Sequence, residues 1–193
     1  MVIGLTGGSG CGKTTALEVL KAMGARCFDA DEVYHELLRT DNAMLAEIDA
    51  AFPGAVENGV LQRKRLGNYV FGNPEALARL TAITHPCVYR AIERELDDGL
   101  NVIDAFGLIE SGLGELCDWT VAVTAPTEAR IDRLVAREGV SRDYAAARIA
   151  AQKSNEEFSG SCMFSLCNDG TAEEFREKCR ILFQKLTKEN THD

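Results

Sequence analysis

Residues 2–14 contain the pattern that decides the fold, and they read Val2-Ile3-Gly4-Leu5-Thr6-Gly7-Gly8-Ser9-Gly10-Cys11-Gly12-Lys13-Thr14. A short apolar run of β type leads into a complete G-x-x-x-x-G-K-[ST] sequence. Its glycines allow backbone angles and a close approach that side chains would prevent, so amide N–H groups can converge on phosphate oxygens at a helix N-terminus. The pattern predicts a nucleoside triphosphate site, in which Lys13 reaches the β- and γ-phosphates and Thr14 ligates Mg²⁺.

The residues after this loop give it the context that the motif requires. Apolar residues recur at helical spacing after Thr15, and Gly24 is typical of a helix C-terminus. A dinucleotide-binding site is excluded by spacing, because no G-x-G-x-x-G frame fits these glycines. The predicted ATP-binding residues of the loop are Gly8, Ser9, Gly10, Cys11, Gly12, Lys13, Thr14 and Thr15.

Length and composition favour one compact α/β unit. The chain has 193 residues, of which 46% are hydrophobic and 26% charged. No apolar run is long enough to span a bilayer, and the N-terminus leads directly into the first expected strand, so we expect no signal peptide and no membrane partner. The formal net charge of −9 argues against a nucleic-acid partner.

Seven cysteines occur without a C-x-x-C pair or a histidine at ligand spacing. This usage predicts a reduced, cytoplasmic protein with free thiols rather than a disulfide framework or a zinc site. Cys11 is the exception of interest, because phosphate-loop amides around a thiol are expected to lower its pKa and favour oxidation or alkylation.

Four further strands and several helices are predicted along the chain. The strands cover about residues 25–29, 101–105, 119–124 and 163–167. Helices are expected at 32–39, 41–51, 141–152 and 173–186, with one after Pro126 that carries Arg130, Arg133 and Arg137 and two more that begin at Asn73-Pro74 and at His85-Pro86. The stretch 53–59, with Pro53-Gly54 and Asn58-Gly59, has loop signals. We therefore expect a core of 1–31, 100–126 and 161–193, a helical insertion at 32–99 and a lid at 127–160.

A kinase for small molecules needs a carboxylate near the γ-phosphate and cations that hold the charge developed during transfer. Asp31, just past the second predicted strand, is the candidate base, although Asp is also a favoured N-cap for the helix that follows it. Arg130, Arg133 and Arg137 share one helix face and could close over the phosphates, although such a face is often merely solvated. A GTPase is disfavoured, because Asp104-Ala105-Phe106-Gly107 fits D-x-x-G but no N-K-x-D occurs.

Several pieces of the sequence together resemble dephospho-coenzyme A kinases, in matching order from about residue 2 to 186. Besides the phosphate loop they are Asp29-Ala30-Asp31, Leu61-Gln62-Arg63-Lys64-Arg65-Leu66, Val70-Phe71, Ile83-Thr84-His85-Pro86, Glu110-Ser111-Gly112-Leu113, the Arg133 to Arg137 segment and Arg148-Ile149-Ala150-Ala151-Gln152. The resemblance implies a three-layer P-loop NTPase fold with about five parallel strands, and transfer of the ATP γ-phosphate to the ribose 3′-hydroxyl of dephospho-coenzyme A.

The resemblance also implies roles for single residues. Asp31 matches the proposed base and Arg137 the lid arginine, so the expected catalytic set is Asp31, Lys13 and Arg137. Arg133 and Asn168 are expected to contact ATP. The insertion would receive the acceptor, with Asp29, Asp31, Arg63 and His85 near it, although His85 is at least as well explained as an N-cap before Pro86. ATP and dephospho-coenzyme A are the expected ligands, and a monomer or weak homo-oligomer the expected state.

Two segments depart from the family pattern D-x-P-L-L-F-E and A-D-x-V-I-x-N. Phe106-Gly107 replaces a proline and a leucine, and Met163 replaces an aspartate. These changes leave three alternatives open: a related kinase for another nucleotide-like acceptor, a nucleotide-binding regulator without catalysis, and, ranked last, an ATP-driven assembly protein.

Overall fold

The computed structural model describes residues 1–189, and these form two compact units. One comprises Met1–Cys27 with the chain from Asp97 onward, and the other is Phe28–Leu96. The second unit begins and ends within a few residues of the predicted insertion 32–99. Whether the chain functions as one kinase domain with an insertion and a lid stays a prediction, and residues 190–193 of the predicted core lie outside the described part.

A five-stranded sheet forms the centre of the first unit, in the order β2-β5-β1-β6-β7. The strands are β1 Val2–Thr6, β2 Arg26–Asp29, β5 Asn101–Asp104, β6 Trp119–Thr124 and β7 Phe164–Cys167. β1 pairs in parallel with β5 and with β6, and β6 pairs in parallel with β7. Most neighbouring strands are not consecutive in the sequence, so crossover connections join them, as the sequence predicts for an α/β protein. The expected P-loop fold class is confirmed.

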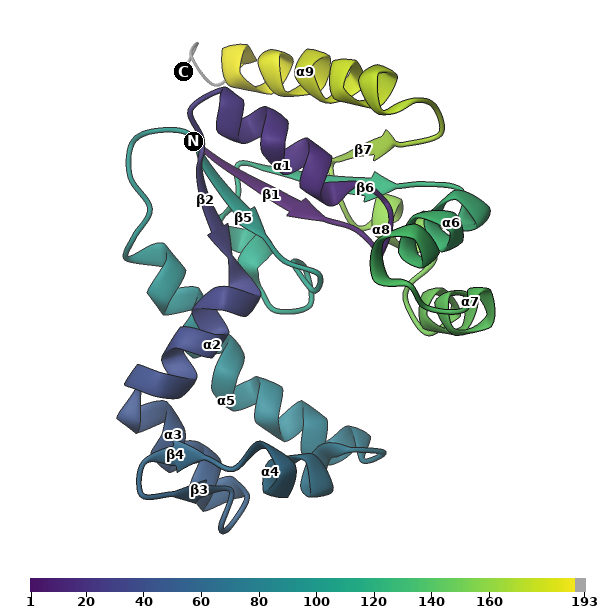
Figure 1. Cartoon of the computed structure of the whole chain (residues 1–193). Helices are drawn as coiled ribbons and strands as arrows, with labels where there is room; N and C mark the ends of the chain where they lie inside the picture. The colour runs from purple at the N-terminus through teal and green to yellow at the C-terminus, as the bar shows by residue number, and fades with distance from the viewer. Residues whose placement is uncertain (190–193) are drawn as a thin grey trace. The chain divides into compact units, whose positions relative to one another are not determined.

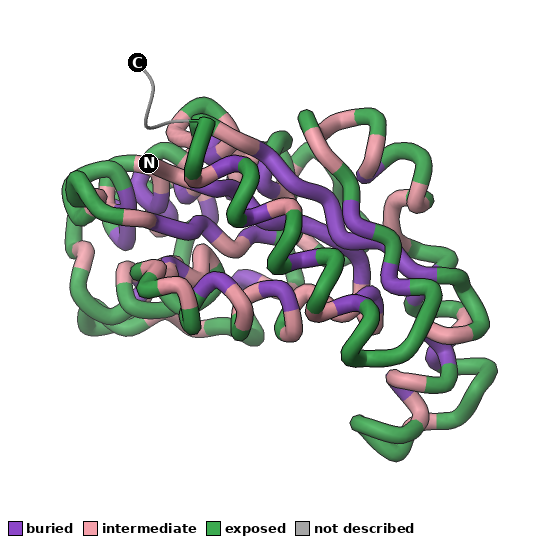
Figure 2. Tube along the Cα trace, turned by 90° about the horizontal axis from the view of Figure 1, so that it is seen from above, coloured by how far each residue is buried: buried purple, intermediate pink, exposed green. Residues whose placement is uncertain are grey.

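Side chains that alternate along β1 show the three layers. Ile3 and Leu5 are fully buried in a core shared with α1 (Lys13–Ala22) and α9 (Ala172–Glu189), which lie side by side over one face of the sheet (Figure 1). Gly4 points the other way, because successive residues of a strand face opposite sides. A Cβ at Gly4 would meet Leu108 and Cys117, in the segment that includes the 3₁₀-helix Leu113–Leu116. The central strands are accordingly buried along most of their length (Figure 2).

Three short helices follow β6 and are α6 (Thr127–Glu138), α7 (Arg142–Ala150) and α8 (Asn155–Gly160). Ile131 and Leu134 of α6 pack against Ala145 and Ile149 of α7. This packing leaves the arginine face of α6 pointing elsewhere, as predicted. The predicted helix 141–152 is too long, because α7 ends at Ala150 and a capping box at Ser154 begins α8, which the sequence analysis missed.

The second unit is mostly helical. It contains α2 (Ala30–Thr40), α3 (Asn42–Ala51), α4 (Arg63–Val70) and α5 (Pro74–Glu93), with a hairpin of β3 (Val56–Glu57) and β4 (Val60–Leu61). Its core is separate from that of the first unit and contains Leu38, Met44, Leu45, Ile48, Phe52, Ala55, Leu66, Leu80 and Cys87. The predicted helices at 32–39 and 41–51 are confirmed within two residues.

The structure corrects the sequence analysis at two places in this unit. His85-Pro86 does not begin a helix, because α5 continues through Pro86 and His85 lies inside it. Leu80 and Thr84 before the proline and Val88 and Ile92 after it are buried, so packing on both sides outweighs the hydrogen bond that proline removes. The loop signal at Asn58-Gly59 marks the turn of the β3–β4 hairpin, and both residues have positive φ (52° and 75°), as a tight hairpin turn requires.

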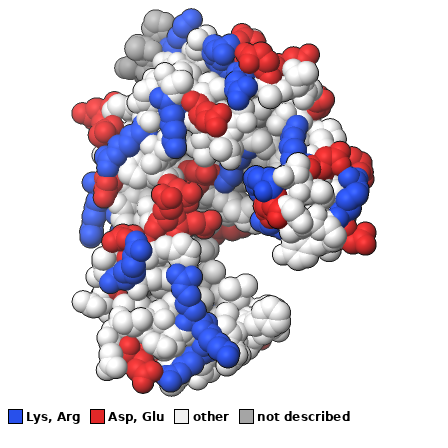
Figure 3. All heavy atoms as spheres, in the orientation of Figure 1, with Lys and Arg blue, Asp and Glu red and all other residues white. Residues whose placement is uncertain are grey.

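Charged side chains of both signs are interspersed on the face shown in Figure 3. Exposed ion pairs include Arg142 with Glu128 at 2.6 Å and Arg148 with Glu138 at 2.7 Å. Exposed pairs contribute only about 0–1 kcal/mol each, so the two apolar cores stabilise the fold.

Within residues 1–189, no helix is both long and apolar enough to cross a bilayer. The absence of a nucleic-acid partner stays a prediction.

Phe183 tests the core between α9 and the sheet, because its side chain is fully buried there. Phe183→Ala should lower the free energy of unfolding by about 3–5 kcal/mol through lost burial and the cavity left behind. Ile181→Ala changes an exposed residue of the same helix and should shift it by no more than about 0.5 kcal/mol. Urea denaturation measures both, and equal effects would contradict this placement of α9.

Candidate nucleotide site

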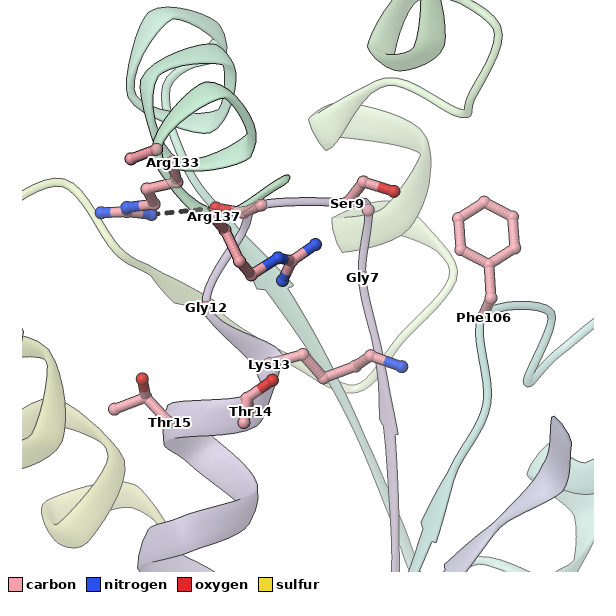
Figure 4. A pocket seen from close by; sticks show the side chains of 12 residues that line it. Gly7, Ser9, Gly12, Lys13, Thr14, Thr15, Phe106, Arg133 and Arg137 are labelled. Atoms are coloured by element: carbon pink, nitrogen blue, oxygen red, sulfur yellow. Dashed lines mark hydrogen bonds between the residues drawn. The ribbon is translucent and has the colours of Figure 1, made fainter. Parts of the chain in front are cut away.

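A cavity of about 650 Å³ opens over the loop between β1 and α1. We call it the phosphate-loop cavity; it is lined by Gly7, Gly8, Ser9, Gly10, Gly12, Lys13, Thr14, Thr15, Phe106, Arg133, Ala136 and Arg137. Every one of these residues belongs to the first unit. The cavity therefore contains all predicted loop residues except Cys11, with two arginines from α6 and Phe106 from the segment after β5 (Figure 4).

Gly12 shows why the loop needs glycine at its end. It has φ of 102° and serves as the N-cap of α1, in a backbone conformation that side chains rarely adopt. A Cβ at this position would also overlap the side-chain amide of Asn168. The sharp turn at Gly12 lets α1 begin at Lys13, so the N-terminus of α1 lies at the cavity.

Lys13 extends from the first turn of α1 across the cavity (Figure 4) and forms an ion pair with Asp104 at the end of β5. Both side chains are largely buried, with exposed fractions of 23% and 12%. β5 and β1 are parallel neighbours, so their C-terminal ends lie together, which places Asp104 beside the loop that follows β1. The sequence analysis noted Asp104 in a discounted D-x-x-G match and as the start of the D-x-P-L-L-F-E segment, but it assigned Asp104 no role at the site.

Arg133 and Asn168 hold the loop from behind. The Arg133 guanidinium donates to the Gly10 carbonyl at 3.1 Å and to the Asn168 side-chain oxygen at 3.1 Å. The Asn168 side-chain nitrogen donates to the Cys11 carbonyl at 3.0 Å, and Asn168 is 6% exposed. Arg133 also lines the cavity, whereas Asn168 is engaged with the loop backbone. Direct contact of either residue with ATP stays a prediction.

Arg130 and Gln152 contact the loop at Ser9, one residue before Gly10. Arg130 Nε donates to the Ser9 carbonyl at 2.9 Å, and Arg130 Nη2 donates to Gln152 Oε1 at 2.9 Å. The same Gln152 oxygen accepts from the Ser9 amide at 2.9 Å, while Gln152 Nε2 donates to Ser9 Oγ at 2.7 Å. Arg130 is therefore not part of a solvated face. The sequence analysis quoted Gln152 in a family segment but assigned it no contact.

Arg137 differs from the two other arginines of its helix face. Its side chain is 59% exposed, and its guanidinium donates to the neighbouring Glu138 at 2.5 Å. Figure 4 shows this guanidinium pointing into the cavity on the side of α6. Arg137 is thus the arginine of the three that lies at the cavity without a bond to the loop backbone.

The expectation for Cys11 is wrong. Its side chain packs into the core of the first unit and is 1% exposed, and burial raises the pKa of its thiol. The hydrogen bond from the Lys13 amide and the charges of Lys13 and Arg130 act in the opposite direction, but they do not offset the cost of a buried thiolate. The side chain of Cys11 therefore packs in the core, whereas its backbone belongs to the phosphate loop.

Four predicted site residues lie in the second unit. Asp29 is the N-cap of α2, because its carboxylate accepts from the amides of Asp31 and Glu32 at 2.9 and 3.2 Å. The alternative that Asp31 is the cap is therefore wrong; Asp31 is exposed in the first turn of α2. Arg63 begins α4, with its guanidinium 3.4 Å from the ring of His35, and His85 is half-buried in α5, where burial lowers its pKa.

Alkylation tests the placement of Cys11. With iodoacetamide at pH 8, the exposed Cys167 should react in the native protein, whereas Cys11 should stay unmodified until the protein is unfolded, because it is buried and its raised pKa lowers the thiolate fraction. Peptide mass spectrometry of timed samples measures both rates. Similar rates for the two thiols in native protein would show that Cys11 is accessible and activated.

Comparison with known proteins identifies the family of the chain. A family model described as Dephospho-CoA kinase matches residues 1–174. A dephospho-CoA kinase of Corynebacterium jeikeium is 38% identical over 185 residues, covering 92% of this chain and 95% of the relative. A crystal structure of a Thermus thermophilus protein has a TM-score of 0.77 at 34% identity, covering 97% of both chains. Dephospho-CoA kinase from Campylobacter jejuni has a TM-score of 0.71 at 26% identity, covering 98% of both. With its intact phosphate loop, the chain belongs to the dephospho-CoA kinase family of ATP-dependent kinases.

Proposed function

We propose that this chain transfers the γ-phosphate of ATP to the 3′-hydroxyl of dephospho-coenzyme A, giving coenzyme A and ADP. The observation that carries the proposal is the phosphate-loop cavity, in which the N-terminus of α1, Lys13 and Arg137 meet in a chain of this family. Backbone amides and the two cations suit a polyphosphate, because each stabilises negative charge on phosphate oxygens.

Lys13 and Arg137 contribute differently in this proposal. Lys13 binds the β- and γ-phosphates, and its present partner Asp104 keeps its ammonium at the cavity before nucleotide arrives. Arg137 is exposed, and within residues 1–189 its guanidinium is bonded to the adjacent Glu138 alone, so it can turn toward the transferred group. A planar guanidinium matches phosphate oxygens and would stabilise the charge that develops on them.

The residues around Lys13 also suit Mg²⁺. Thr14 lines the cavity with a hydroxyl, and Asp104 brings a carboxylate to Lys13. Mg²⁺ prefers such oxygen donors and typically takes one or two protein ligands together with water and substrate phosphates. We propose that the Thr14 hydroxyl and the Asp104 carboxylate are the protein ligands of the ion. When bound, Mg²⁺ neutralises charge on the phosphate oxygens.

Asp31 is our candidate for the general base. Asp29 performs the capping of α2, and among the described residues no hydrogen bond or ion pair engages the Asp31 carboxylate. In the proposed step this carboxylate takes the proton of the 3′-hydroxyl while the 3′-oxygen bonds to the γ-phosphorus. The bond from that phosphorus to its bridging oxygen breaks, and ADP leaves with the electron pair.

We place acceptor binding in the second unit, with Asp29, Arg63 and His85 as candidate contacts. Arg63 is exposed at the start of α4, where a cation could bind a phosphate of the acceptor. His85 is half-buried, and burial lowers the pKa of its ring, which favours the neutral form. A cytoplasmic location and a monomer or weak homo-oligomer complete the proposal; all seven cysteines are free, as in a reducing compartment.

The acceptor and the base are tested together by ADP release with ATP, Mg²⁺ and dephospho-coenzyme A, with the product checked for a new 3′-phosphate. Asp31→Asn should lower kcat by roughly 100- to 10,000-fold and leave ATP affinity nearly unchanged, because the base acts on the acceptor. Glu32→Gln changes the adjacent exposed carboxylate and should keep wild-type activity.

The outcomes of this assay separate the alternatives. Wild-type activity in Asp31→Asn would remove Asp31 from the role of base. ATP binding without phosphorylation of dephospho-coenzyme A would favour another acceptor or a regulator, and transfer to a related nucleotide-like alcohol would identify the former.

Lys13→Ala should weaken ATP binding and lower kcat/KM by about 100-fold or more, because the ammonium contacts the phosphates in the ground state and in the transition state. Lys21→Ala, in the last turn of the same helix, serves as the control and should do neither. Calorimetric ATP binding and steady-state kinetics measure the two effects. Unchanged ATP affinity in Lys13→Ala would contradict the proposed position of the triphosphate.

A further inference from the structure

Arg130 is a buried cation without a buried anion beside it. Its exposed fraction is 2%, and its guanidinium contacts two neutral oxygens, the Ser9 carbonyl and Gln152 Oε1. Within residues 1–189, no carboxylate lies within the 4.0 Å of a salt bridge to Arg130. Burial lowers the pKa of this guanidinium, but arginine is not deprotonated in proteins, so Arg130 remains charged. A buried charge is costly unless an opposite charge compensates it.

The Arg130 guanidinium lies directly behind the phosphate loop. A Cβ at Gly8 would overlap it, and the Gly10 Cβ position is 2.7 Å from the Arg130 carbonyl. Gly8, Ser9 and Gly10 line the cavity with their other side. Arg130 itself does not line the cavity, so the backbone of the loop segment that it contacts lies between its charge and a ligand there.

Gln152 fixes the loop at the same point and is itself neutral. Its oxygen accepts from the Ser9 amide and from Arg130, and its nitrogen donates to Ser9 Oγ. A glutamate here could accept from the same two donors, but its charge would neutralise Arg130. A neutral amide holds the loop and leaves the positive charge for the ligand.

We propose that Gln152 and Arg130 are positioning residues for the polyphosphate: Gln152 fixes the Ser9 segment, and Arg130 supplies an uncompensated positive charge behind the loop that favours the more highly charged nucleotide. The inference rests on the proposed function only in taking a nucleoside polyphosphate as the ligand. It does not depend on the acceptor or on Asp31.

Gln152→Glu tests the charge while it keeps an acceptor for Ser9 and Arg130. Binding of ATP and of ADP, each with excess Mg²⁺ and no acceptor, is measured by calorimetry. The variant should bind ATP about tenfold or more weakly and lose less affinity for ADP, because the added charge acts more strongly on the more negative ligand. Thermal stability should stay equal or rise, because Arg130 gains an ionic partner.

Two further variants complete the test. Gln152→Ala removes the contacts to Ser9 but leaves Arg130 charged, so it should weaken ATP and ADP by similar factors. Gln184→Glu makes the same charge change at an exposed position of α9 and should change neither affinity.

Equal losses for ATP and ADP in Gln152→Glu, or no loss, would overturn the proposal, as would a loss fully explained by lowered thermal stability. The proposed function can fail separately. If the ATP and ADP affinities change in Gln152→Glu as expected, but the wild-type protein does not phosphorylate dephospho-coenzyme A, only the assigned acceptor is contradicted. Wild-type protein that binds no nucleotide contradicts both.

Discussion

The site depends on how the backbone carbonyls of the phosphate loop are held. A loop whose amides converge on phosphates must direct its carbonyls the other way, where they need donors. Arg130 donates to the Ser9 carbonyl, Arg133 to that of Gly10 and Asn168 to that of Cys11. These donors come from α6 and from the segment after β7, so the shape of the loop depends on segments far from it in the sequence.

The charges around the loop fall into two sets with different partners. Lys13 is bonded to Asp104, so one positive charge at the cavity is balanced before nucleotide binds. Arg130 and Arg133 are bonded to neutral oxygens, and within residues 1–189 no carboxylate forms a salt bridge with either cation. A chain of net charge −9 thus maintains a locally positive site for an anionic ligand, because burial concentrates the field of the few cations at the loop.

Structure formed by residues close together in the sequence could be predicted, whereas contacts between residues far apart in the sequence could not. The β1–loop–α1 unit was predicted because its residues are contiguous and the motif contains its own geometric requirements. The bonds from Arg130 to Ser9 and from Gln152 to Ser9 join positions 121 and 143 residues apart, and no local pattern indicates them. The prediction at Pro86 was wrong for a related reason. Local propensity predicts that a helix starts there, but the buried residues before and after the proline keep α5 continuous.

The positions where the chain departs from its family lie outside the hydrogen bonds that hold the loop. Met163 is 62% exposed just before β7, and its amide donates to Thr120 Oγ1 at 3.0 Å. Phe106 borders the cavity and packs edge-on against Phe158 at 5.7 Å between ring centroids. Asn168, a few residues after Met163, keeps its buried bonds to Arg133 and Cys11. Because an exposed residue and a residue at the cavity border can change without moving the loop carbonyls, the hydrogen bonds that hold the phosphate loop are present despite these departures.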